Sequence, residues 1–144
     1  MKPYEIAAEV KPSERQLNWQ KTEFYGFINF GLATVVNKEW TDGSVSPVNF
    51  CPDEFDAVEW VEFFKDAGFK GMVLNVKHHD GFCLWDSQYT RYSVASATDW
   101  DVENRDIVDL LSKECKAQGL KFGIAISPLD RREESYGSGE AYNT

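Results

Sequence analysis

A run of apolar residues that ends in a polar cluster constrains the fold of this chain more than any other feature. Residues 71–76 (Gly-Met-Val-Leu-Asn-Val) form the run, and residues 77–80 (Lys-His-His-Asp) follow it. A short apolar segment without alternation is typical of a strand covered on both faces of a parallel sheet. Gly81 then allows a sharp turn. The sequence therefore predicts a buried strand whose carboxyl end carries both histidines of the protein.

Two further apolar segments, at residues 24–30 and 122–126, also have the character of strands. Between the three segments, apolar residues recur at helical spacing. One stripe consists of Ala57, Trp60, Val61, Phe64 and Ala67, and the other of Ile107, Val108, Leu111 and Cys115. Asp53 is the predicted N-cap of the first helix, and Asp106 lies at the start of the second. Strands that alternate with helices predict an α/β fold with a parallel sheet.

The remaining residues are expected to connect or precede these elements. Residues 1–22 are polar and charged, and they form a predicted lead-in to a domain that spans residues 23–144. Residues 34–49 and 80–100 are predicted loops. Glycines at positions 68 and 119 are expected to end the two helices.

Length and charge restrict the class of protein. A chain of 144 residues suits one ordinary domain. A net charge of -9 and a pI near 4.7 argue against a nucleic-acid or membrane-surface partner. No apolar stretch reaches membrane length, and the N-terminus lacks the apolar core of a signal peptide. We therefore expect a periplasmic or extracellular location if a signal has been removed, and a cytoplasmic one otherwise.

The cysteines predict neither a disulfide framework nor a metal site. Cys51, Cys83 and Cys115 are odd in number and have no C-x-x-C spacing. Cys83 lies between Phe82 and Leu84, which favours packing over a role as a nucleophile. Adjacent histidines do not easily converge on one tetrahedral ion, and the chain has no third histidine. We expect no metal and no other cofactor.

The segment around the histidines also resembles a known family. Residues 77–87 (Lys-His-His-Asp-Gly-Phe-Cys-Leu-Trp-Asp-Ser) resemble the signature of the α-L-fucosidases of glycoside hydrolase family 29. Three other regions resemble that family in the same order along the chain. They are residues 29–32 with 38–40, residues 50–52 with 55–60, and residues 119–123 with 127–131. Four linked motifs in the right order are far more specific than any one of them.

The resemblance implies the N-terminal part of a (β/α)8 TIM-type barrel. A complete barrel typically needs about 250 residues, so this chain would supply about three βα units. In the family, the residues that match Glu39, Trp40, His78 and His79 line the fucose pocket. Imidazoles and a carboxylate suit sugar hydroxyls. The expected substrate-binding residues are Asn29, Glu39, Trp40, His78 and His79, and the expected partner is a fucosylated glycan.

The resemblance also implies a retaining mechanism, which uses a carboxylate nucleophile and an acid/base about 5–5.5 Å apart. In the family both groups follow later strands than the three predicted here. We therefore expect no catalytic residue in this chain, and no activity from its 144 residues alone. The alternative is a non-catalytic carbohydrate-binding remnant of a fucosidase.

Three positions depart from the family pattern. The family usually has histidine where Asn29 stands, tyrosine around Ala125 and Ile126, and tryptophan in place of Leu129. Asparagine still donates and accepts hydrogen bonds, but it is shorter than histidine and cannot take a charge. Together these changes predict an altered specificity or a weakened enzyme.

An incomplete barrel would leave two strand edges open. Unpaired edges template pairing with another chain, so a homo-oligomer is expected. The side chains of Ile28, Leu74 and Ile124 are expected to form an exposed apolar inner face.

Overall fold

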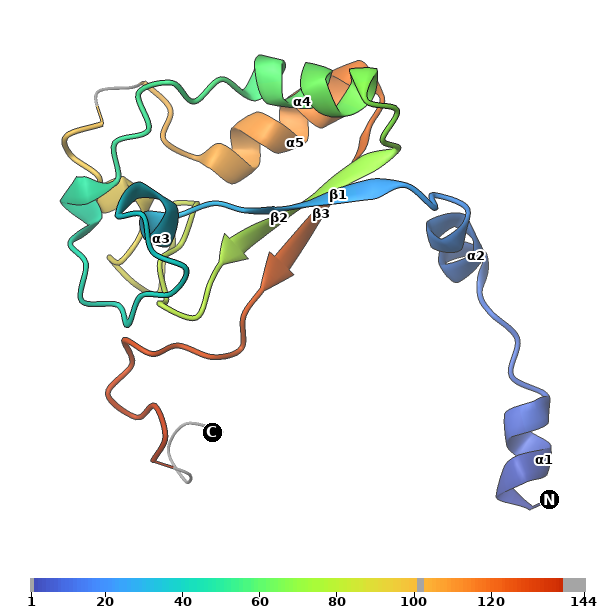
Figure 1. Cartoon of the computed structure of the whole chain (residues 1–144). Helices are drawn as coiled ribbons and strands as arrows, with labels where there is room; N and C mark the ends of the chain where they lie inside the picture. Colours follow the sequence, from blue (N-terminus) through green and yellow to red (C-terminus); the bar gives the residue numbers. More distant parts are fainter. Residues whose placement is uncertain (1, 101–102, 139–144) are drawn as a thin grey trace.

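Three parallel strands form the centre of the molecule (Figure 1). The computed structural model describes residues 2–100 and 103–138. The strands are β1 (Tyr25–Asn29), β2 (Gly71–Lys77) and β3 (Lys121–Ile126), in the spatial order β1-β2-β3. Within the described residues, β1 and β3 each pair only with β2, so the sheet is open at both edges. The predicted α/β class with parallel strands is confirmed.

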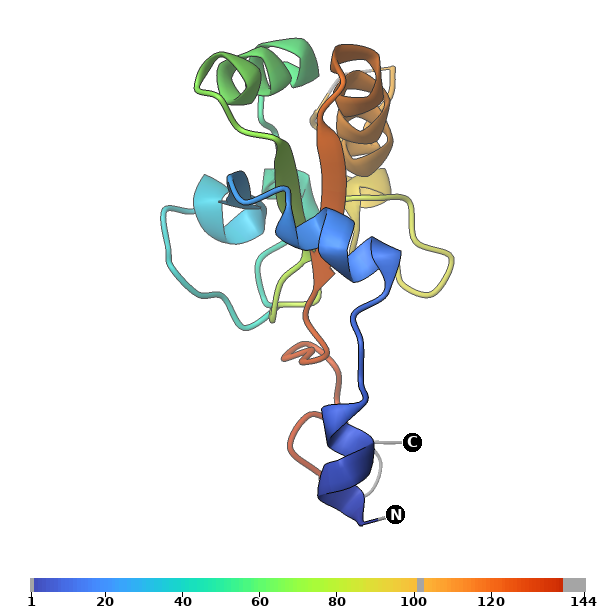
Figure 2. The same ribbon diagram turned by 90° about the vertical axis from the view of Figure 1, so that its right-hand side faces the viewer.

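Two helices lie side by side on one face of the sheet (Figures 1 and 2). They are α4 (Ala57–Asp66), between β1 and β2, and α5 (Ile107–Gln118), between β2 and β3. The core lies between these helices and the sheet. Its fully buried side chains include Val61 of α4, Met72 and Leu74 of β2, and Leu111 and Cys115 of α5. The two predicted helical stripes therefore face the sheet, except for Ala67, which is exposed and lies just past the end of α4.

The start of α4 corrects one prediction. Its N-cap is Asp56, whose Oδ1 accepts hydrogen bonds from the backbone N–H groups of Val58 (2.8 Å) and Glu59 (3.1 Å). Asp53 was the wrong choice, because it lies three residues before the cap, in a separate turn outside α4. Asp106 does cap α5, by accepting a hydrogen bond from the backbone N–H of Asp109 at 2.8 Å.

The strand register corrects a second prediction. Ile28 pairs with Leu74, and Leu74 pairs with Ile124, so the three side chains point to the same side of the sheet. That side faces the helices, and Leu74 is fully buried there. The prediction that these residues form an exposed inner face is therefore wrong about the face and about Leu74. Ile124, on the edge strand β3, is nevertheless 54% exposed. The opposite, open face carries Phe27, which is 55% exposed, and Asn29.

The lead-in and the connections contain short helices that the sequence did not predict. They are α1 (Pro3–Ala8), α2 (Glu14–Gln20), α3 (Leu32–Val35) and the 3-10 turns η1 (Pro47–Asn49) and η2 (Val94–Ser96). α1 extends away from the body of the molecule (Figure 1). Across the described parts of the chain, every helix is too short or too polar to cross a bilayer. The boundary at residue 23 stays a prediction.

Candidate functional site

The ends of the three strands bring the predicted site residues together. Asn29 is the last residue of β1, and His78 and His79 directly follow β2. Ser127 directly follows β3. Because the strands are parallel and neighbouring, their carboxyl ends meet at one edge of the sheet. Polar side chains at that edge are the usual source of active sites in α/β barrels.

Both imidazoles pack against one tryptophan. The ring centroids of His78 and His79 are 4.6 Å apart. The Trp40 ring lies 5.2 Å from His78 and 5.0 Å from His79, and it is nearly parallel to the His79 ring, at 8°. Consecutive residues within a strand point to opposite faces. These two share a neighbour because β2 ends before them, at Lys77.

Four of the five predicted site residues line one pocket of about 360 Å³: Asn29, Glu39, Trp40 and His78. Asp80 and Phe82 contribute to the same wall. His79 is not on the lining. It stacks on Trp40 and shares a hydrogen bond between its Nδ1 and the Oγ of Ser127. The pocket is thus open to a ligand at His78, while His79 supports the tryptophan.

Asn75 is a polar lining residue that the sequence analysis missed. Asn75 interrupts the apolar run of β2, and its side-chain amide is hydrogen-bonded to that of Asn29 at 2.9 Å. The two asparagines are direct partners in the parallel register. A polar residue inside an otherwise apolar strand was the signal for this contact. The bond engages the Asn29 side chain inside the pocket.

The environment of His78 favours a neutral ring. Partial burial lowers the pKa of His78 below its ordinary value, and the neighbouring His79 adds to this effect, while Asp80 opposes it. A neutral imidazole has one donor and one acceptor nitrogen. The pocket therefore offers groups that match the mixed donor and acceptor character of hydroxyls.

The carboxylates that follow β2 and β3 are engaged in structural contacts. Asp80 is 2% exposed and accepts a hydrogen bond from the hydroxyl of Thr41 at 2.6 Å. Asp130 forms an ion pair with Lys77, at 3.1 Å between Nζ and Oδ2. The sequence analysis gave neither residue a catalytic role.

The cysteines show packing rather than reactivity. Cys83 is buried, and burial raises the pKa of its thiol to about 11. A thiol in that state is a poor nucleophile near neutral pH. Cys115 lies fully buried beside Met72. Among residues 2–100 and 103–138, no group of three histidine, cysteine, aspartate or glutamate side chains is arranged to hold a metal ion.

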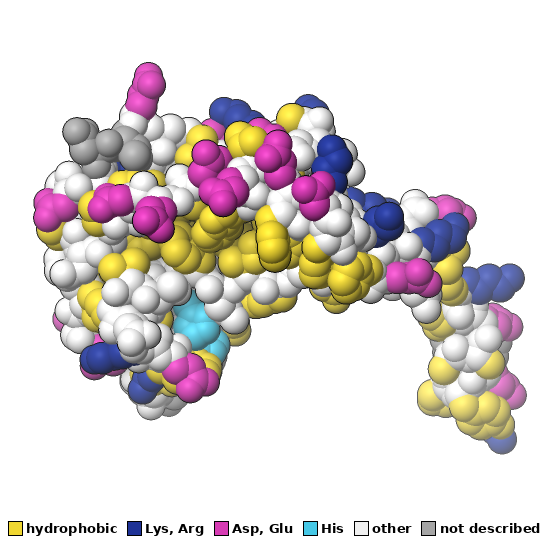
Figure 3. Space-filling view, turned by 45° about the horizontal axis from the view of Figure 1, so that its top comes forward, with side chains coloured by type: hydrophobic (Ala, Val, Ile, Leu, Met, Phe, Trp, Pro, Cys, Tyr) yellow, Lys and Arg dark blue, Asp and Glu magenta, His cyan; other side chains and the backbone are white. Residues whose placement is uncertain are grey.

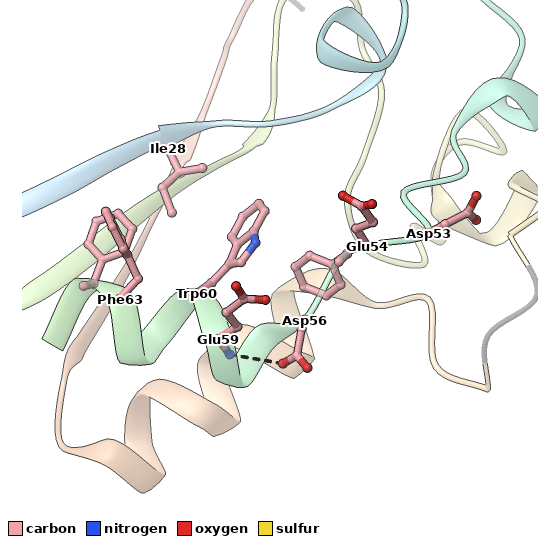
Figure 4. A pocket seen from close by; sticks show the side chains of 9 residues that line it. Ile28, Asp53, Glu54, Asp56, Glu59, Trp60 and Phe63 are labelled. Carbon is pink, nitrogen blue, oxygen red and sulfur yellow. Dashed lines mark hydrogen bonds between the residues drawn. The ribbon is translucent and has the colours of Figure 1, made fainter. Parts of the chain in front are cut away.

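A larger hollow of about 850 Å³ lies elsewhere, between β1 and α4 (Figure 4). Trp60 and Phe63 of α4 point toward Ile28 of β1, and carboxylates such as Glu54 and Glu59 surround them (Figure 4). In the space-filling view an apolar band runs beneath a row of acidic side chains, with histidine below it (Figure 3). None of the predicted site residues lines this hollow, and it is not at the carboxyl ends of the strands. The smaller pocket is therefore the better candidate site.

Sequence comparison matches the described features to one family. The model of the α-L-fucosidase family matches residues 4–144. Alpha-L-fucosidase 1 of Arabidopsis thaliana is 41% identical over 143 residues, which cover 99% of this chain and 28% of that protein. The chain thus spans little more than a quarter of the length of that relative.

Solved structures agree with the sequence comparison. The crystal structure of SpGH29 matches with a TM-score of 0.81 and 35% identity, covering 92% of this chain and 30% of that one. A GH29 fucosidase of Ruminococcus gnavus in complex with fucose matches with a TM-score of 0.78 and 40% identity, covering 89% of this chain and 26% of that one. The predicted partial TIM-type barrel is confirmed by these matches. The chain belongs to the α-L-fucosidase family, GH29, and covers part of its catalytic domain.

Proposed function

We propose that this chain forms one wall of the fucose pocket of a retaining α-L-fucosidase. The observation that carries the proposal is the cluster of Trp40, His78 and His79 at the carboxyl ends of the strands, with Glu39 on the same lining. The ligand in the Ruminococcus gnavus relative, fucose, supports the substrate class. The proposed partner is a fucosylated glycan.

Each group has a distinct part in holding the sugar. The imidazole of His78 bonds hydroxyls through either nitrogen, and the Glu39 carboxylate accepts hydroxyl hydrogens in charge-assisted bonds. Trp40 is 48% exposed, so one side of its ring is free to cover an apolar edge of the sugar. Asn29 and Asn75, which are paired on neighbouring strands, supply amide groups to the same lining.

Hydrolysis needs two further carboxyl groups in this proposal. A retaining glycosidase forms a covalent intermediate at one carboxylate, and the second carboxyl serves first as acid and then as base. We expect both from regions of the barrel beyond these three strands. The 144-residue chain by itself is therefore expected to bind sugar without turnover.

A second candidate is a non-catalytic carbohydrate-binding protein derived from a fucosidase. The observation that favours it is the Asn29 amide, which replaces the usual histidine and is engaged by Asn75. Hydrolysis of an aryl α-L-fucoside by a longer natural form of the protein would separate the two, because only the enzyme shows turnover.

Sugar binding is tested with a matched pair of tryptophan variants. Trp40 and Trp19 are almost equally exposed, at 48% and 49%, but only Trp40 lines the pocket. We expect Trp40→Ala to weaken L-fucose binding about tenfold, since an aromatic contact contributes about 0.5–1.5 kcal/mol beyond its buried area. Trp19→Ala should bind like the parent chain.

The measurement is the shift of the two histidine ring signals in NMR titrations with L-fucose, with D-glucose as the control sugar. Equal affinity of Trp40→Ala and the parent chain would contradict the assigned pocket. No saturable response of the parent chain to L-fucose would contradict the proposed function itself.

A further inference from the structure

The loop that carries Glu39 and Trp40 is held more firmly than its position suggests. Residues 36–46 contain no helix or strand, and most of them are exposed. Thr41 and Gly43 are buried nonetheless. Trp40 lies between the exposed Glu39 and the buried Thr41. Its ring is nearly parallel to that of His79. A loop without regular structure needs specific contacts to fix a side chain in this way.

The first contact joins the loop to the residue that follows the histidines. The hydroxyl of Thr41 donates to Oδ2 of Asp80 at 2.6 Å, and both residues are buried, at 6% and 2% exposure. The other carboxylate oxygen of Asp80 accepts from the backbone N–H of Phe82 at 3.1 Å. The bond thus links the residue after Trp40 to the residue after His79.

The second contact joins the loop to the segment that follows β3. Nη1 of Arg132 donates to the backbone carbonyl of Gly43 at 2.5 Å. Its guanidinium lies 4.3 Å from the Tyr92 ring centroid, and the Tyr92 hydroxyl donates to the carbonyl of Val45 at 2.8 Å. Gly43 has φ +82°, and a Cβ there would lie 2.5 Å from that of Arg132. The close approach therefore requires glycine.

From these contacts we infer that Thr41 and Arg132 are positioning residues that hold Trp40 over the histidine pair. The inference rests on the proposed function in one respect, namely that the positioned ring is a wall of the sugar pocket. Neither residue touches the sugar in this scheme. The Thr41 contact fixes the loop directly beside Trp40, and the Arg132 contact fixes it at Gly43, further along the chain. Release of either contact lets the tryptophan leave His79.

The Thr41 contact is the sharper of the two to test, because the chain offers a matched pair of variants. Thr41→Val keeps the shape of the side chain and removes the hydroxyl, whereas Thr41→Ser keeps the hydroxyl and removes a methyl group. Without the hydroxyl, a buried oxygen of Asp80 loses its donor, which opposes the closed loop. If Thr41 acted only by filling space, Thr41→Ser would disturb the loop more than Thr41→Val, because serine lacks the methyl group.

The readout is the ring-current shift of the His79 ring protons, which the parallel Trp40 ring displaces. The chain has two histidines, so His78→Gln assigns the signals. Trp40→Leu gives the position of the His79 signal without a stacked ring. We expect Thr41→Val to move the signal most of the way to that position and Thr41→Ser to leave it near the parent value. An unchanged signal in Thr41→Val would overturn the inference.

Arg132 provides the second variant, which matters if Thr41→Val does not fold. Arg132 is exposed, so Arg132→Gln is expected to fold and to move the His79 signal some of the way in the same direction. The backbone amide signals of Leu74 and Ile124 report whether the sheet is intact in each variant. If the sheet is intact and Arg132→Gln leaves the His79 signal in place, the contact to Gly43 does not position Trp40.

Binding of L-fucose is measured on the same samples but decides a different question. If Thr41→Val loses the stacking and the parent chain does not bind L-fucose, the positioning role holds and the proposed function fails. Both the positioning role and the proposed function hold if the parent chain binds L-fucose, Thr41→Val binds it about tenfold more weakly and Thr41→Ser binds it like the parent. The tenfold figure is the loss expected when the aromatic contact of Trp40 with the sugar is removed.

Discussion

At the scale of single residues, the site depends on where β2 ends. His78 and His79 both reach Trp40 because the strand ends at Lys77, and the apolar run in the sequence predicted that end to within one residue. The partners of these side chains were not predictable. Thr41 contacts Asp80 and Ser127 contacts His79, each across a long stretch of chain. Nothing in the local sequence of Thr41 or Ser127 indicates these partners.

Protonation of His78 gives a residue-scale prediction. Burial lowers its pKa in the folded chain below the ordinary 6.5, so between these two pKa values the unfolded chain binds more protons. Stability should therefore rise with pH through that window and fall as His78 becomes protonated. We expect His78→Gln to remove this contribution to the pH dependence.

The measurement is the free energy of unfolding by urea at several values between about pH 5 and pH 8, for both proteins. Carboxylates and other groups are common to both, so only the difference between the two curves is assigned to His78. A difference that stays constant across this range would show that His78 is not the group responsible.

At the scale of elements, the sequence predicted what depends on periodicity and missed what depends on context. The strands and the helices α4 and α5 were anticipated, because their apolar stripes repeat at the spacing of each structure. The four-residue helix α3 and the turns η1 and η2 are too short for a repeat. Asp53 and Asp56 are both acceptable caps by residue type, and only Asp56 has the two N–H groups within reach.

The cap of α5 gives a prediction at this scale. Asp106 accepts from the backbone N–H of Asp109, which otherwise has no partner within the helix. Asp106→Ala should lower the free energy of unfolding by about 1 kcal/mol, and Asp106→Asn, which keeps an acceptor, should cost much less. Urea unfolding with an unchanged m-value is the measurement. Equal losses for alanine and asparagine would mean that charge, rather than the hydrogen bond, stabilises this end.

At the scale of the whole molecule, the three-stranded sheet leaves two strand edges open. β1 and β3 have one bonded neighbour each among the described residues. An apolar band lies between β1 and α4 (Figure 3). Phe63 of α4 is 67% exposed, and Ile124 and Ile126 on β3 are each 54% exposed. The sequence predicted the open edges and an exposed Ile124. It did not predict the exposed Phe63, and it placed Leu74 on an exposed face although the helices cover it.

Open edges with apolar side chains predict self-association of the 144-residue chain. A strand edge offers unpaired N–H and C=O groups to another copy, and a charged side chain on such an edge opposes the pairing. Phe27→Lys places a charge on the open face of β1, whereas Val58→Lys places the same charge on the exposed side of α4. We expect the parent chain and Val58→Lys to sediment as oligomers at micromolar concentration, and Phe27→Lys to shift toward the monomer.

The parent's thermal midpoint should then rise with protein concentration, because association stabilises the folded form by mass action. A monomer at every concentration, with a midpoint independent of concentration, would show that the three strands and their helices close a sufficient core without a partner.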